Sequence, residues 1–218
     1  MCSSDLGLFL LVWAVAASLW QAQPFDPSYY ASPPVPPNGE IYPLSDAFNH
    51  DVIANNALIG EDFRFGGLRA IRKPLYAMLL AGLHSLAGAD YAGIVAWQVM
   101  VLALFPAVIF ALGQRLGGRL AGLAAAGFII FREANAIRLE SLVNFSHAKL
   151  LMADLPAALG LALLALAAFH WLRRRPGSGL AALAVGGLMG ALMLLRSQQL
   201  TLIPVLADRK STRLNSSH

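Results

Sequence analysis

Charged residues are scarce in this chain of 218 residues. Asp, Glu, Lys and Arg together make up 13% of the sequence, whereas 57% is hydrophobic. A soluble domain needs about a quarter of its residues charged to cover its surface. The mean hydropathy of +0.60 therefore excludes an ordinary water-soluble globule, and it also excludes a disordered chain, which is poor in apolar residues. We expect the apolar side chains to face lipid.

Cysteine is almost absent, and no single basic patch is present. The one cysteine, Cys2, excludes a disulfide-rich fold. The net charge of +4 and the pI of about 9.6 would suit a nucleic-acid-binding protein, but the Lys and Arg residues are scattered between apolar runs. We therefore expect no nucleic-acid partner and attribute the charge to membrane topology.

Both ends of the sequence differ in character from the rest. Residues 1–6 and 208–218 are similar to translated sequencing-adapter sequence, and we set them aside as artefacts. The remainder, residues 7–207, begins inside an apolar stretch that no basic segment precedes, which is not typical of a signal peptide. We expect the chain to be a fragment of a longer membrane protein.

Long apolar runs are what the chain has in abundance. About 17–25 helical residues cross a hydrocarbon layer of about 30 Å, and in an open chain only helices satisfy their own backbone there. The sequence predicts an all-α polytopic bundle of about five spans, at residues 7–22, 91–112, 120–131 with its flanks, 155–172 and 180–195. Tryptophans near the ends of these runs are expected to be interfacial anchors: Trp13, Trp20, Trp97 and Trp171.

Arginines mark the cytoplasmic side of these predicted helices. Arg115 and Arg119 lie in one short connection, and Arg173, Arg174 and Arg175 lie in another; neither connection contains an acidic residue. The positive-inside rule places both connections in the cytoplasm. Every Asp and Glu outside the two ends set aside then falls on the periplasmic side. We expect a multi-pass protein of the cell inner membrane, surrounded by membrane lipids, whose outer face carries the chemistry.

The longest connection, residues 23–88, lies on the outer side. Its first part is rich in proline and is expected to run extended, because proline interrupts both helices and sheets. Ser45 is expected to cap an amphipathic helix over residues 46–59. The apolar run at 74–87 is about 14 residues long, too short to span, and is expected to be an interfacial or re-entrant helix. A second outer loop covers residues 133–154.

Ionisable residues beside apolar spans are costly to place, so each is a candidate for function. Three outer clusters stand out: Asp46 with His50 and Asp51; Arg69 with Arg72 and Lys73; and the second outer loop with Glu133, Glu140 and Asp154. Plainer interpretations stay open. Asp154 suits an ordinary helix cap, and Lys73 suits a side chain that reaches lipid headgroups. For Glu133 and Glu140 we favour solvation of the loop.

The order of these features resembles the polytopic GT-C glycosyltransferases. It is most similar to glycosyltransferase family 39, which includes the protein O-mannosyltransferases and the aminoarabinose lipid A transferases. The shared features are a first span, a long outer loop with an early Asp, the step Arg72-Lys73-Pro74-Leu75-Tyr76, the inner turn Leu116-Gly117-Gly118-Arg119 and the helix start Asp154-Leu155-Pro156. The similarity covers residues 7–204, which would form only the N-terminal part of such an enzyme.

The resemblance implies transfer of a sugar from a polyprenyl-phosphate donor to a protein or lipid acceptor on the periplasmic face, with inversion at the anomeric carbon. By matched position, Asp46 is the general base and Asp154 a second acid needed for activity. Lys73, with Arg72 and Arg69 beside it, would hold the donor phosphate. A carboxylate within reach of a hydroxyl accepts its proton, and a cation stabilises the departing phosphate.

The sequence departs from the family at two positions. Ala47 stands where mannosyltransferases have a second acid, and Arg72 stands where the aminoarabinose branch has an acid that helps to bind a metal. We therefore expect Arg72 to pair directly with phosphate, and we expect no metal cofactor. Two other function classes remain open. A transporter would show broken helices and charges at mid-membrane, and a non-catalytic membrane scaffold would tolerate any outer-loop sequence.

Overall fold

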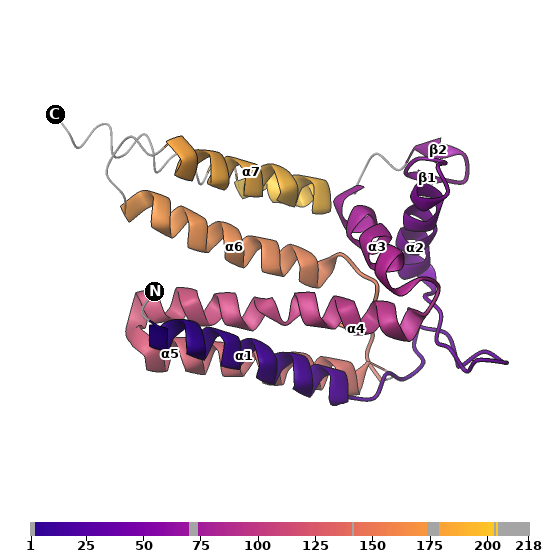
Figure 1. The fold of residues 1–218 in the computed structure, drawn as a ribbon, viewed down its shortest axis with the longest axis horizontal. Coiled ribbons are helices and arrows are strands. Elements are labelled where there is room, and N and C mark those ends of the chain that lie inside the picture. The colour runs from indigo at the N-terminus through magenta and orange to yellow at the C-terminus, as the bar shows by residue number, and fades with distance from the viewer. Residues whose placement is uncertain (1–2, 70–73, 141, 174–178, 203, 205–218) are drawn as a thin grey trace.

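The computed structural model describes residues 3–69, 74–140, 142–173, 179–202 and 204. The long helices run along the long axis of the molecule (Figure 1): α1 (Ser3–Ala22), α4 (Tyr91–Leu102), which α5 (Leu104–Leu139) continues, α6 (Asp154–Arg173) and α7 (Gly179–Leu195). The smaller elements are α2 (Ser45–Leu58), the strands β1 (Arg64–Phe65) and β2 (Leu68–Arg69), α3 (Pro74–Ala87) and the 3-10 helix η1 (Ser197–Thr201). Helices α2 and α3 cover one end of the bundle, which we call the cap end.

Three helical stretches in the described part of the chain are long and apolar enough to cross a membrane: Ser4–Ala22, Tyr91–Leu139 and Asp154–Arg173. Helix α7, with 17 residues, and helix α3, with 14, are apolar but shorter. The prediction of a mainly helical chain with membrane-compatible helices is therefore confirmed. The lengths alone do not establish five crossings.

The stretch Tyr91–Leu139, 49 residues in all, folds back on itself at Gly118. The backbone of Gly118 has φ 85° and ψ 177°, a region open essentially only to glycine. The two arms then approach closely, because a Cβ built on Gly122 would lie 2.6 Å from the carbonyl oxygen of Phe110. The stretch is therefore a helical hairpin. Its turn carries Arg115 and Arg119, and we call this end of the bundle, where α6 also ends at Arg173, the arginine end (Figure 1).

Helix α1 packs against this hairpin through its tryptophans. Trp20 is fully buried, and its Nε1 donates to the carbonyl oxygen of Ile130 at 3.1 Å. Trp13 donates in the same way to Met100, at 2.9 Å. A buried indole normally finds such an acceptor. The expectation that Trp20 anchors the helix at the interface is wrong, because Trp20 joins two helices inside the bundle, whereas Trp97 is exposed as expected.

The outer connection forms the elements that the sequence predicts, with one error in detail. The proline-rich part is extended and is held by the isolated bridges Ser28↔Ala31, Ala31↔Pro43 and Val35↔Glu40. Helix α3 has the predicted bounds, and α2 is shifted by one residue. Ser45 does not cap α2. It is the first helical residue, with φ 53°, and Leu44 occupies the cap position without a side-chain hydrogen bond.

Candidate active site at the cap end of the bundle

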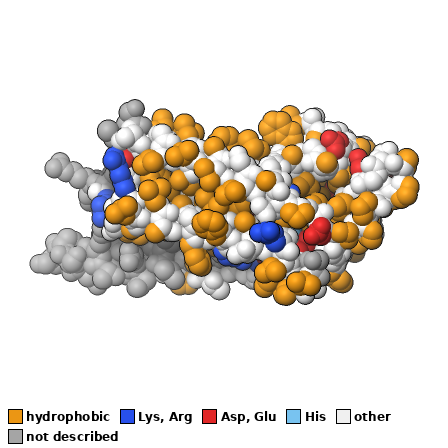
Figure 2. Space-filling view, turned by 90° about the horizontal axis from the view of Figure 1, so that it is seen from below, with side chains coloured by type: hydrophobic (Ala, Val, Ile, Leu, Met, Phe, Trp, Pro, Cys, Tyr) orange, Lys and Arg blue, Asp and Glu red, His pale blue; other side chains and the backbone are white. Residues whose placement is uncertain are grey.

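Charged side chains lie at both ends of the bundle, and the cap end carries basic residues, among them Lys149 and Arg196, as well as acidic ones. Figure 2 shows hydrophobic side chains over most of the surface, a basic group at the left end, and both acidic and basic side chains in the right half. Helices α4 and α6 begin at the cap end, beside Asp90 and at Asp154. At the arginine end, Asp5 accepts hydrogen bonds from Gln114 and Arg119, at 2.8 and 2.9 Å.

Asp46 lies in the first turn of α2 and is exposed. A helix N-terminus favours a carboxylate through the aligned peptide dipoles. None of the hydrogen bonds or ion pairs between described residues involves the Asp46 carboxylate. Its oxygen atoms are therefore accessible to a solute at the cap end, as a general base requires.

Asp154 is the first residue of α6, and its carboxylate forms an ion pair. Its Oδ1 lies 2.5 Å from Nη2 of Arg196, which follows the last residue of α7. The two side chains are 30% and 34% exposed, respectively, so the pair lies at the rim of the bundle. The interpretation of Asp154 as a plain helix cap does not describe this geometry. The pair instead joins the cap-end termini of α6 and α7.

Of the three residues predicted to bind the donor phosphate, the structure describes only Arg69. Arg72 and Lys73 lie outside the described residues. Arg69 lies in β2, where its backbone pairs with Arg64 across a tight turn. Gly66 and Gly67 form that turn with φ 57° and 81°, as two-residue hairpins require. The hairpin precedes α3, so Arg69 belongs to the cap end, and the binding of phosphate stays a prediction.

Asp51 is the centre of a buried polar cluster that joins three helices. It lies about 140° around α2 from Asp46 and is only 3% exposed. Its Oδ1 is 2.7 Å from Nε2 of His84 in α3, and its Oδ2 accepts from the hydroxyl of Tyr91 in α4 at 2.5 Å. Asn55 donates to the same Oδ2 at 3.1 Å. The sequence predicts that Asp51 and Asp46 belong to one cluster, but the two carboxylates face opposite sides of α2.

His84 uses both of its ring nitrogens. Nδ1 lies 3.1 Å from the carbonyl oxygen of Gly88, and Nε2 faces Asp51. Two acceptors favour the doubly protonated ring, and the hydrogen bond to Asp51 is the main reason that the pKa of His84 is raised. With both nitrogens occupied, the pair holds α2 and α3 together and has no position left for a substrate.

The second outer loop folds into the bundle rather than into solvent. Glu133 is fully buried, and its Oε1 accepts from the backbone amide of Ala148 at 2.6 Å. Arg132 donates to the other oxygen at 3.0 Å. On the opposite side, the Gln98 amide donates to the carbonyl oxygens of Ala148 and Leu150, both at 2.8 Å. The solvated role favoured for Glu133 is therefore wrong.

Glu140 is buried in the same way. It is 1% exposed, and its Oε2 lies 2.5 Å from Nε2 of His147, which is also 1% exposed. Among the described residues, its Oε1 has no hydrogen-bond partner. The prediction that Glu140 solvates the loop is wrong, because the loop returns His147 onto it.

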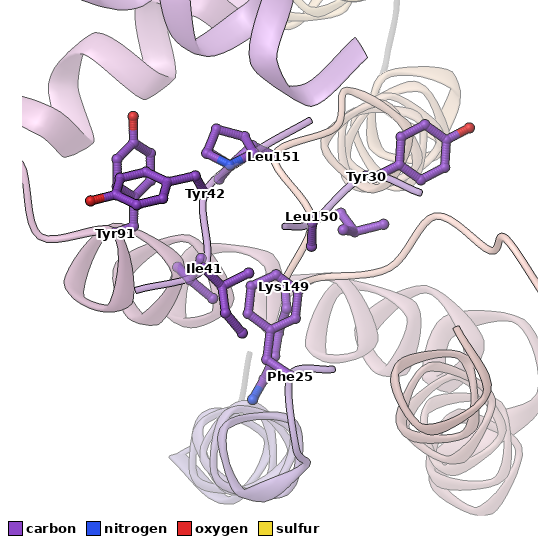
Figure 3. Close-up of a pocket in the computed structure, with 11 residues that line it drawn as sticks. Phe25, Tyr30, Ile41, Tyr42, Tyr91, Lys149, Leu150 and Leu151 are labelled. Carbon is purple, nitrogen blue, oxygen red and sulfur yellow. The ribbon is translucent and has the colours of Figure 1, made fainter. Parts of the chain in front are cut away.

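Lys149 is a buried cation that the sequence analysis missed. It is 6% exposed, and its Nζ donates to the carbonyl oxygens of Gln21 and Gln23, at 3.1 and 2.5 Å. These carbonyls lie at the end of α1, where backbone acceptors lack helical partners and the helix dipole favours a cation. Figure 3 shows the side chain pointing away from Tyr42 and Tyr91 toward this helix. Burial lowers the pKa of the Lys149 ammonium.

A cavity of about 490 Å³ lies beside Lys149 at the cap end, within the usual range of ligand pockets, about 300–1,000 Å³. Phe25 and Tyr91 provide aromatic lining, and Glu40 and Asp90 provide carboxylates. Such a lining can accept hydrogen bonds from hydroxyl groups and pack against an apolar face. Asp46 is not among the lining residues.

Neither a metal centre nor a known relative identifies the chemistry. In the described part of the chain, no group of three or more His, Cys, Asp or Glu side chains is placed to hold a metal ion. No protein-family model, curated protein or solved structure matches the chain.

Proposed function

We propose that the chain forms about five transmembrane spans and is the N-terminal part of a membrane glycosyltransferase. The enzyme transfers a sugar, with inversion, from a polyprenyl-phosphate donor to an acceptor hydroxyl at the periplasmic face. The observation that carries the proposal is the exposed Asp46 carboxylate at the cap end, opposite the end that holds Arg115, Arg119 and Arg173. Its support is the resemblance in motif order together with the position of this carboxylate opposite those arginines.

In the proposed reaction, Asp46 acts on the acceptor. Its carboxylate takes the proton of the acceptor hydroxyl while that oxygen bonds to the anomeric carbon. The bond between this carbon and the phosphate oxygen breaks, and the electron pair leaves with the polyprenyl phosphate. Positive charge develops on the sugar ring in such a reaction, so carboxylates at the same end stabilise the transition state.

The basic segment before α3 would hold the donor. Arg69 ends the second strand of the β-hairpin, and in the sequence Arg72 and Lys73 come between it and an apolar helix of 14 residues. Cations next to an apolar helix suit a substrate that combines a phosphate with a lipid chain. The ion pair between Asp154 and Arg196 would keep the cap-end termini of α6 and α7 together.

Replacing Asp46 tests the proposal. In the complete enzyme, Asp46→Asn keeps the size of the side chain and removes its ability to take a proton. We expect sugar transfer to fall about 10²–10⁴-fold, the usual contribution of a general base, with unchanged insertion in the membrane. The measurement is transfer of radiolabelled sugar from polyprenyl-phosphate donors in membrane preparations.

Glu61→Gln is the matched control, because Glu61 is an exposed carboxylate in the same outer connection. We expect this variant to keep wild-type transfer. Equal transfer by Asp46→Asn and wild type would remove Asp46 as the base, and no transfer by wild type from any polyprenyl-phosphate sugar would remove the proposed activity.

A further inference from the structure

A second large cavity lies at the opposite end of the bundle, between α6 and α7. Its volume is about 450 Å³. Most of its lining is aliphatic, and the lining residues of these two helices are Leu163, Leu166, Ala167, His170, Leu180, Ala181, Ala184 and Leu188. Several of these side chains are exposed or half-buried, so the cavity is a lateral groove that opens on the bundle surface.

Basic side chains lie at one end of the groove. Arg115, from the hairpin, also lines it, and its Nη1 contacts Nδ1 of His170. The guanidinium carries only donors, so Nδ1 of His170 is the acceptor in this contact. The two side chains come from different elements and meet where the apolar wall ends. Arg173 follows one turn later on α6, with its guanidinium 4.2 Å from the centre of the Phe169 ring. The groove therefore has an apolar body and a basic head.

The groove is shorter than the hydrocarbon part of one membrane leaflet, which is half of the full layer. His170 and Leu163 are separated by seven residues of α6, which is about 10 Å along the helix axis. The hydrocarbon layer of a bilayer is about 30 Å thick. The groove thus begins at the arginine end and stays within the nearer half of the membrane if the bundle spans it.

We propose that this groove binds an acidic phospholipid of the cytoplasmic leaflet, with its phosphate at Arg115 and His170 and one acyl chain along α6 and α7. Charge complementarity selects this occupant, because basic pockets between membrane helices on the cytoplasmic side bind acidic headgroups. Among the described residues no carboxylate pairs with Arg115, so a purely apolar partner helix would leave its guanidinium without an anion in a low-dielectric surrounding, which is costly. The lipid site is separate from the cap end, so it does not depend on sugar transfer.

Native mass spectrometry of the purified protein tests this proposal. The protein in detergent is titrated with phosphatidylglycerol and with phosphatidylcholine of the same acyl chains. We expect wild type to prefer phosphatidylglycerol, and Arg115→Gln to lower its affinity for this lipid about fivefold, the effect of one cation near an acidic headgroup. Arg138→Gln is the charge-matched control, because Arg138 is exposed near the cap end of α5.

A second pair of variants tests the acyl-chain part without a change of charge. Ala184 and Ala182 are both exposed alanines of α7, but only Ala184 lines the groove. We expect Ala184→Phe to reduce binding of phosphatidylglycerol and Ala182→Phe to leave it unchanged. Equal affinity of wild type for both lipids, or equal effects of Arg115→Gln and Arg138→Gln, would overturn the proposal. So would a wild-type dimer that only Ala184→Phe dissociates, because the occupant would then be a second copy of the chain.

Discussion

The proton on His84 decides how strongly α2 is held to α3. The ring and the Asp51 carboxylate are 6% and 3% exposed, respectively, so water screens their attraction little. When the ring is neutral, one of its two nitrogens no longer donates, although both face acceptors. The protonated ring therefore stabilises the folded protein more than the neutral ring does.

Stability should consequently fall as the pH rises. The pKa of His84 is raised in the folded protein above its ordinary value, which is about 6.5. The folded state therefore holds this proton more tightly than the unfolded state does. The stabilisation is fully present below about pH 6.5 and is lost as the pH rises through the raised pKa. Thermal unfolding in detergent between about pH 6 and pH 9 measures the effect.

Two histidine variants separate this effect from other titrations. His84→Gln cannot take up the proton, and we expect its unfolding temperature to depend less on pH over this range. His170→Gln is the comparison, because His170 contacts Arg115 at the arginine end and lies outside the Asp51 cluster; it should keep more of the wild-type dependence than His84→Gln does. A wild-type profile that rises with pH would contradict the assignment.

Residue roles could be predicted from the sequence only where the local pattern determines them. The exposure of Asp46 follows from its place in the first turn of an amphipathic helix. The burial of Glu133 and Lys149 could not be predicted, because their partners are backbone groups far away in the sequence, such as the Gln21 carbonyl. No local pattern indicates which loop amide will meet a carboxylate.

Helix bounds were more predictable, for reasons that individual residues show. Helix α3 begins at Pro74, and proline favours the first helical position. It ends before Gly88, which has φ 67°, as helix C-termini favour. The break at Ala103 was not predicted. It lies three residues before Pro106, whose missing amide hydrogen leaves the carbonyl of the preceding turn without a partner.

The close approach of the two arms at Gly122 gives a prediction at the scale of the element. A methyl group on Gly122 would meet the Phe110 carbonyl oxygen at 2.6 Å and the Gln114 amide nitrogen at 2.9 Å. Both are backbone atoms of the facing arm, which cannot move independently. We expect Gly122→Ala to destabilise the protein by about 1–3 kcal/mol, the usual cost of overpacking, as measured by thermal unfolding in detergent.

Gly127 provides the control on the same arm. A Cβ at this position would meet no atom within 4 Å, and alanine favours a helix more than glycine does. We expect Gly127→Ala to be neutral or stabilising. Equal losses of stability in the two variants would show that the hairpin arms are not packed as described.

At the scale of the whole molecule, the hairpin is what would convert three long stretches into four crossings. Each arm of Tyr91–Leu139 then crosses separately, α7 adds the fifth crossing, and both η1 and the cap end lie on one side. The proposed orientation follows from the arginines at the opposite end. The pattern of apolar runs predicted these segments and the short connection with Arg115 and Arg119 between them, and the backbone of Gly118 places the reversal within that connection.

Single cysteines test this topology. With Cys2 replaced by Ser, a cysteine is introduced at an exposed position in place of Glu61, Leu116 or Gln198. In right-side-out membrane vesicles, we expect an impermeant maleimide to label Glu61→Cys and Gln198→Cys. Leu116→Cys should react only in inside-out vesicles. Labelling of Gln198→Cys on the same side as Leu116→Cys would mean that α7 does not cross.

The contact of Lys149 with the end of α1 also constrains how the protein is made. Lys149 follows Gln21 by 128 residues, and chains are synthesised at about 5–20 residues per second, so roughly 6–25 s separate the two on the ribosome. During that interval the last carbonyls of α1 are not yet bound by this ammonium. Helix α1 is synthesised before the loop that carries Lys149 and reaches its final hydrogen bonding only after that loop has emerged.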